Sequence, residues 1–79
     1  MSEEKLFEII ARVFNISIEQ INDQSNSETI DSWDSFTVYI LLDEIELAYN
    51  VSITTEESFE IKKVNDIKNI LKEKRVNFA

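Results

Sequence analysis

The stretch SFTVYILLDEIELAYN, residues 35–50, decides the fold. It contains no glycine or proline, and its apolar residues recur at helical spacing, so we expect a helix that Asp34 or Ser35 caps at its start. At ~100° per residue, most of the apolar side chains gather on one side, which is the predicted core face, with Tyr39 at its edge. The residues of this face are Val38, Leu41, Leu42, Ile45, Ala48 and Tyr49.

The same helix carries a second, narrower group of apolar residues, nearly opposite the core face. This apolar stripe consists of Phe36, Ile40 and Leu47 and is bordered by Asp43 and Glu44. A helix in a small bundle rarely buries both faces, so the stripe predicts a docking surface for a partner. In the alternative interpretation, neighbouring segments of the chain cover part of it.

A helical pattern precedes this stretch. Leu6, Ile9, Ile10 and Val13 recur at helical spacing, and we expect a helix to about residue 15 with Ser2 as its N-cap.

Two helical segments follow the central stretch. Thr54 and Glu57 fit a capping box, which predicts a short helix that ends near Ile61. A last helix is expected over residues 64–74, and residues 76–79 are expected to be frayed.

Residues 16–34 are rich in the short polar side chains that form turns. We expect one long loop with a helical turn near Glu19, anchored by Ile16, Ile18 and Ile21. The sequence therefore predicts an all-α fold with a single domain over residues 1–79. This is a small four-helix bundle, with three longer helices, one short helix and a long loop between the first two helices.

The composition excludes several classes of function. The chain has 79 residues with a net charge of −8 and no histidine, cysteine, glycine or proline. It therefore lacks disulfides, the common zinc ligands, a glycine-rich phosphate loop and the usual base for serine catalysis, so we expect no enzyme activity. The acidic field predicts basic protein partners and not nucleic acid or anionic membranes. Because there is no apolar run of about 20 residues and no signal segment, we expect a cytoplasmic protein without a membrane span. We also expect a monomer.

A calcium site is a weaker alternative in the long loop. Asp23, Ser25, Ser27, Thr29, Asp31 and Asp34 have the ligand offsets of an EF-hand loop. The glycine needed at the sixth position is Glu28, and Asp34 is shorter than the usual bidentate glutamate. We therefore expect no metal site.

The junction Trp33-Asp34-Ser35-Phe36 is the remaining candidate site. By spacing alone, Asp and Ser before an apolar helix are ordinary N-caps. However, the whole chain resembles the acyl carrier protein family. The resemblance includes this junction at the start of an acidic and apolar helix, the long loop before it, the segment Tyr49-Asn50-Val51-Ser52-Ile53, and the short and last helices after it.

The resemblance implies that the Ser35 hydroxyl carries 4′-phosphopantetheine, installed from coenzyme A by a phosphopantetheinyl transferase that binds Mg²⁺. The thiol of the arm then holds acyl groups as thioesters for biosynthetic enzymes, as in fatty acid biosynthesis. Asp34 matches the acidic residue that helps the transferase engage the serine. The expected contacts to partner enzymes with basic docking surfaces are Phe36, Ile40, Asp43, Glu44, Leu47, Glu56 and Glu57.

The chain departs from the family pattern in two ways. Many fatty-acid carriers have a glycine shortly before the Asp-Ser pair, which is absent here, and Thr37 and Ile40 stand where the family is often acidic. These departures favour a specialised pathway, with a fatty acyl, hydroxyacyl or aminoacyl cargo. The rival hypothesis is an acidic helical adaptor that binds a basic partner through the apolar stripe, with Ser35 serving only as an N-cap.

Overall fold

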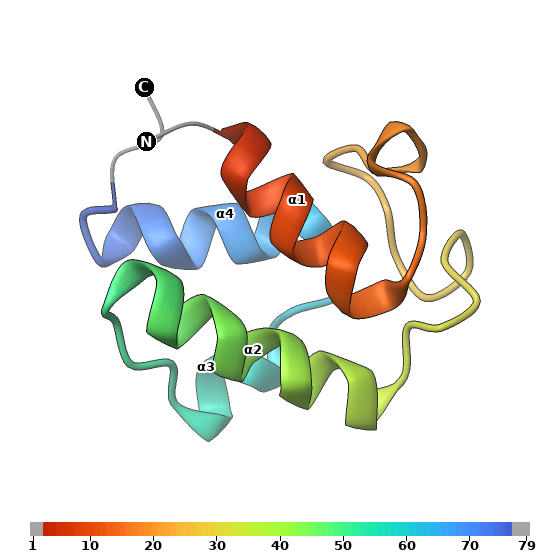
Figure 1. Cartoon of the computed structure of the whole chain (residues 1–79). Helices are drawn as coiled ribbons and strands as arrows, with labels where there is room; N and C mark the ends of the chain where they lie inside the picture. Colours follow the sequence, from red (N-terminus) through yellow and green to blue (C-terminus); the bar gives the residue numbers. More distant parts are fainter. Residues whose placement is uncertain (1–2, 77–79) are drawn as a thin grey trace.

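The computed structural model describes residues 3–76, which are mostly helical and form a compact globule (Figure 1). The elements are α1 (Glu3–Phe14), the 3₁₀ turn η1 (Ile18–Gln20), α2 (Ser35–Tyr49), α3 (Thr55–Phe59) and α4 (Val64–Glu73). The predicted helices are confirmed, with ends that differ by one or two residues. Within the described range there is no β-strand, and no helix is both long and apolar enough to cross a membrane. The expected N-cap Ser2 and most of the expected frayed end lie outside the described residues.

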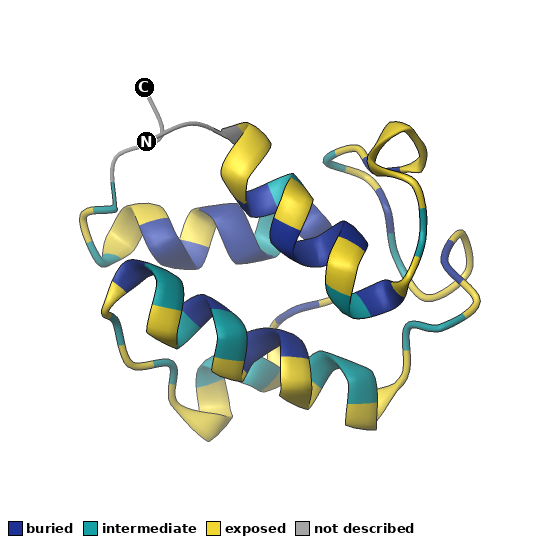
Figure 2. Cartoon of the chain, in the orientation of Figure 1, coloured by how far each residue is buried: buried dark blue, intermediate teal, exposed yellow. Residues whose placement is uncertain are grey.

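The core forms where α1, α2 and α4 meet (Figure 2). As predicted, the core face of α2 is buried at Leu41, Leu42, Ile45 and Tyr49, whereas Val38 and Ala48 are half-buried against the core. The other helices and the long loop supply the remaining buried side chains, which include Leu6, Ile10, Phe14, Ile21, Ile30, Val64, Ile67 and Leu71. By contrast α3, which lies wholly within the described residues, contributes no buried side chain.

One sequence expectation about burial is wrong, and one edge residue of the core face is largely exposed. Tyr39, which the sequence places at the edge of the core face, is 75% exposed. Ile18 was expected to anchor the loop, but it is exposed. It belongs to η1, a turn whose backbone is satisfied locally, since Ser17 and Gln20 form a capping box across it. Of the other predicted anchors, Ile21 is buried and Ile16 is partly buried against the core, and Ile30 is a further anchor that the sequence did not indicate.

The long loop is attached to the start of α4 by its own backbone. The carbonyl of Ser25 accepts from the Val64 N–H (3.0 Å), and the carbonyl of Asp23 accepts from the Asn65 N–H (2.9 Å). These bonds satisfy N–H groups in the first turn of α4, which would otherwise lack partners. The Asp23 carboxylate also accepts from the buried ammonium of Lys68 at 2.9 Å. The loop is therefore fixed to α4 at several points.

The end of the loop is attached to α1. The indole of Trp33 stacks on the ring of Phe14, with ring centroids 5.2 Å apart, and the Ser32 hydroxyl donates to the Phe14 carbonyl at 2.8 Å. Ile30, just before them, is buried. These contacts fix the direction in which the chain enters α2.

Helix ends that often use glycine are made without it. Asn15 and Asn50, directly after α1 and α2, have φ of 57° and 55°, in the left-handed region. Asparagine tolerates this conformation better than most residues, because its short polar side chain can bond locally. The chain therefore turns sharply after each of these helices although it contains no glycine.

Candidate functional site at the start of helix α2

The carboxylate of Asp34 caps α2. Asp34 has an extended backbone, and its Oδ1 accepts from the Thr37 N–H at 2.8 Å and from the Thr37 hydroxyl at 2.9 Å. These bonds to Thr37 stabilise the charged carboxylate and lower the pKa of Asp34 below its ordinary value. The sequence left open whether Asp34 or Ser35 is the cap, and the structure assigns the role to Asp34.

The Ser35 side chain is thereby left available. Ser35 is the first residue of α2 and is exposed, and its hydroxyl makes no hydrogen bond to any residue in the range 3–76. It stands at the positive end of a long helix, where the dipole and the first N–H groups favour a negative group. An attached phosphate would therefore be compatible with this position, and an external protein could reach the hydroxyl.

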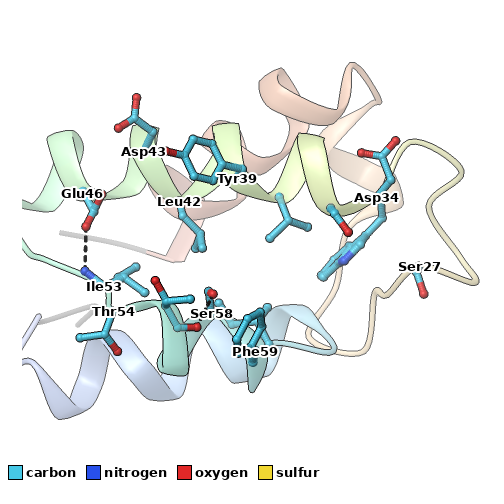
Figure 3. A pocket seen from close by; sticks show the side chains of 15 residues that line it. Ser27, Asp34, Tyr39, Leu42, Asp43, Glu46, Ile53, Thr54, Ser58 and Phe59 are labelled. Carbon is cyan, nitrogen blue, oxygen red and sulfur yellow. Dashed lines mark hydrogen bonds between the residues drawn. The ribbon is translucent and has the colours of Figure 1, made fainter.

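Ser35 borders an open groove of about 770 Å³ between α2, the loop and the α3 segment (Figure 3). Leu42 points from α2 toward the α3 side, where Ile53 and Ser58 lie opposite it. Apolar side chains and hydroxyl groups both line the groove, Glu46 also borders it, and no lysine or arginine is among the described residues that line it. Asp34 and Asp43 also border the groove, but their carboxylates point away from α3 in Figure 3. The groove suits an uncharged or apolar occupant.

Polar bonds hold α3 in place on the far side of the groove. The Glu46 carboxylate of α2 accepts from the Ile53 N–H at 2.7 Å, shortly before α3 begins. Thr54 and Glu57 form the predicted capping box, and Glu57 also pairs with Lys74 at 3.0 Å. The backbone bond to Thr54 and, after it, the hydrogen bond to Lys74 lower the pKa of Glu57. Because α3 itself buries no side chain, its position depends on this polar frame and on Ile53 and Ile61 at its two ends, which pack in or against the core.

The predicted partner-contacting acids fall into two groups. Glu44 bonds to Arg12 at 3.2 Å, and Glu57 is engaged in the capping box and with Lys74. Asp43 and Glu56 are exposed and form no hydrogen bond or ion pair with another described residue. Of the four predicted acids, Asp43 and Glu56 are therefore the two without a bond to another described residue.

The predicted apolar stripe is not covered. Phe36 and Leu47 are 73% and 77% exposed, and Ile40 is 39% exposed, so neither α3 nor the loop hides them. Two further exposed side chains, Tyr39 and Phe59, line the groove from α2 and α3 and were missed in the sequence. The only signal for Phe59 was its place as the one large apolar residue of a five-residue helix.

The acidic residues among the EF-hand-like offsets in the loop do not converge. Within residues 3–76, no three acidic, histidine or cysteine side chains come together as metal ligands would. Asp23, the first of the offsets, bonds to Lys68 instead. The chemistry of the site therefore centres on one accessible hydroxyl at a helix start, beside a groove. No protein-family model matches the sequence.

Proposed function

We propose that the chain is a carrier protein with a four-helix bundle of the acyl carrier type. In this proposal the Ser35 Oγ bears 4′-phosphopantetheine, and the protein shuttles thioester-bound acyl groups as a cytoplasmic monomer. The observation that carries the proposal is the exposed Ser35 hydroxyl, free of hydrogen bonds to the described residues, at the first turn of α2. A residue needed only as an N-cap would have its side chain bonded to the helix backbone, and Asp34 has that role instead.

The surroundings of Ser35 are compatible with the attached group. The start of α2 favours a phosphodiester electrostatically, and the Asp34 carboxylate beside it is oriented by two hydrogen bonds to Thr37. The arm would supply the thiol that this cysteine-free chain lacks. The adjoining groove, which is lined in part by apolar side chains, offers space for an acyl group.

The chain's own part in loading is to present the nucleophile. The Ser35 oxygen attacks the phosphorus next to the pantetheine of coenzyme A, the pyrophosphate bond breaks, and adenosine 3′,5′-bisphosphate leaves. The hydroxyl proton passes to a base of the transferase, because this chain has no histidine. Asp34 lies beside the attacking oxygen and is the residue the transferase and its Mg²⁺ would engage.

The experiment is an intact-mass measurement after incubation with coenzyme A, Mg²⁺ and several broad-specificity transferases. We expect a gain of one phosphopantetheine in the wild-type protein and in Ser27→Ala, which changes another exposed serine that lines the same groove. We expect no gain in Ser35→Ala. No gain in the wild type with any transferase, or a gain that persists in Ser35→Ala, would reject the proposal.

The second candidate function is a protein-interaction adaptor. It is favoured by the exposure of the apolar stripe, which a helix needs for docking whether or not Ser35 is modified. An adaptor predicts partner binding that Ser35→Ala leaves unchanged and no phosphopantetheine on the protein. The same mass measurement therefore separates the two candidates.

A further inference from the structure

Residues 22–29, which we call the strap, are the part of the long loop that contains only polar residues. They lie between Ile21 and Ile30, whose side chains are 6% and 2% exposed and anchor the two ends in the core. Bonds within the strap, such as the one from the Asn22 N–H to the Ser25 hydroxyl at 2.9 Å, give it a structure of its own. The strap can therefore move as a unit about its two anchors, because no apolar side chain of its own is buried in the core.

The strap meets the start of α4 along a seam of backbone hydrogen bonds. The Val64 N–H donates to the Ser25 carbonyl at 3.0 Å. The Asn65 N–H donates to the Asp23 carbonyl at 2.9 Å. Both N–H groups belong to the first turn of α4, where the helix itself supplies no acceptor. Water can replace the strap carbonyls at this helix end, so the backbone bonds of the seam are easily exchanged.

A buried ion pair reinforces the seam. The Lys68 ammonium of α4 donates to the Asp23 carboxylate at 2.9 Å, and the two side chains are 5% and 45% exposed. The same ammonium lies 5.9 Å from the centroid of the Phe7 ring in α1. Lys68 is the one buried charged residue of the range 3–76. An ammonium removed from water needs a countercharge, and the closed strap brings the Asp23 carboxylate to it.

We propose that the strap is a movable wall of the groove beside Ser35, and that the ion pair between Lys68 and Asp23 is the latch that keeps it closed. Ser27, inside the strap, lines the groove from the side of the loop (Figure 3). When the latch opens, the strap swings outward about its two anchors and the groove widens at this end. A slender chain fits the closed groove of about 770 Å³, whereas a bulky, rigid group needs the wider one. That the occupant is a group carried on Ser35 rests on the proposed function.

The first test follows the seam by native-state hydrogen exchange, measured by NMR. The Val64 and Asn65 amides report the opening of the strap, and the Ile45 amide, at a fully buried position of α2, reports global unfolding. In the wild type we expect the Val64 and Asn65 amides to exchange faster than the Ile45 amide. Lys68→Met should speed the two seam amides about tenfold, as for the loss of a hydrogen bond to a charged group. It should not speed the Ile45 amide.

The unequal effect on seam and core distinguishes a latch from a residue that only stabilises the fold. Lys68→Met keeps an unbranched side chain and removes a buried charge, and the Asp23 carboxylate that it leaves is reached by water. Asp23→Asn removes the other charge of the pair, leaves Lys68 in place, and should speed the same seam amides. The matched control is Lys63→Met, which removes an exposed bond to Gln24 at 3.3 Å and should change their exchange less than about threefold.

The second test measures the groove with two neutral probes on the unmodified protein. The Kd of the slender 1-hexanol and of the bulky 1-adamantanemethanol is measured by NMR titration. A probe that binds only when the strap is open has a Kd that falls in proportion to the open fraction. Lys68→Met should therefore lower the Kd of 1-adamantanemethanol by the factor that it adds to the exchange of the seam amides, about tenfold. The Kd of 1-hexanol should change less than about twofold.

A disulfide between the strap and the residue before α4 supplies the opposite perturbation. Asn26 and Lys63 pair in an isolated antiparallel bridge. Their Cα atoms are therefore about 4.5–5.5 Å apart, a separation that a disulfide spans. Asn26→Cys/Lys63→Cys in this cysteine-free chain can form one bridge only. The oxidised form should slow the Val64 amide and raise the Kd of 1-adamantanemethanol about tenfold over the reduced form of the same variant.

Several results would overturn the latch proposal. Seam amides that exchange no faster than the Ile45 amide in the wild type would show that the strap does not open by itself. Equal acceleration of seam and core in Lys68→Met would make Lys68 a stabilising residue only. A Kd of 1-adamantanemethanol that is the same with the strap locked and released, or no binding of this probe to any variant, would reject the movable wall. Absence of phosphopantetheine transfer rejects the proposed function instead, because neither test requires a group on Ser35.

Discussion

Replacement of Ile30 tests whether the long loop is part of the cooperative core. Ile30 is 2% exposed, although it lies in a segment without regular secondary structure. Ile30→Ala removes about three methylene equivalents at about 0.8 kcal/mol each and leaves a cavity, so we expect a loss of about 3 kcal/mol in the free energy of unfolding. Domains have about 0.05–0.15 kcal/mol of stability per residue, so the variant stays folded but has lost a large share of its stability.

The matched control is Ile18→Ala in the same loop. Ile18 is 36% exposed and belongs to η1, which projects from the core, so we expect a loss of about 1 kcal/mol. Both variants are unfolded with urea, with helicity followed by circular dichroism and the loop by the fluorescence of Trp33, the single tryptophan. Coincident transitions of the two probes show that the loop and helices unfold together.

Two results would refute this reasoning. Equal losses for Ile18→Ala and Ile30→Ala would show that burial in the loop does not determine its contribution to stability. A fluorescence transition at lower urea than the helical transition in the wild type would show that the loop melts alone. In that case the contacts of Trp33 with Phe14 would not fix the entry into α2.

Two further predictions concern the cap of α2. Ser35→Ala should leave the thermal midpoint nearly unchanged, whereas Asp34→Ala should lower it, because Asp34 makes the capping bonds; equal drops in circular dichroism melts would contradict this assignment. The bonds to Thr37 lower the pKa of Asp34. The contribution of its carboxylate to stability is therefore fully present above the pKa of the carboxyl in the unfolded chain, about 4, and is lost as the pH falls through the folded pKa. The difference in midpoint between the wild type and Asp34→Ala should therefore shrink in acid, and a difference that grows there would reverse the sign of the linkage.

Local chemistry made much of the fold predictable from the sequence. The spacing of apolar residues identified the core face of α2, and the pair Thr54 and Glu57 identified the start of α3. These signals depend on neighbours within a few residues, and the periodicity of a helix relates them directly. The ends were less predictable: α3 stops at Phe59 and not near Ile61, because Ile61 leaves the helix to join the core.

The loop was harder to predict because its contacts are distant in sequence. Nothing in residues 16–34 indicates that the carbonyls of Asp23 and Ser25 accept from the start of α4. One anchor, Ile18, was misjudged and another, Ile30, was missed for the same reason. Ile18 and Ile30 are both isolated apolar residues among polar ones, and only their tertiary positions distinguish the exposed side chain from the buried one.

The candidate site shows the same division between local and distant contacts. The position of Ser35 at a helix start followed from the sequence, and the exposure of the stripe was expected from the wheel. The sequence could not show which acids stay without an internal bond. Glu44 accepts from Arg12 and Glu46 accepts from the backbone of Ile53, and both donors come from other parts of the chain. An acidic helix is therefore not by itself a charged docking surface. On α2, internal bonds take up two of the three carboxylates, and the surface that is left beside Ser35 is mainly apolar.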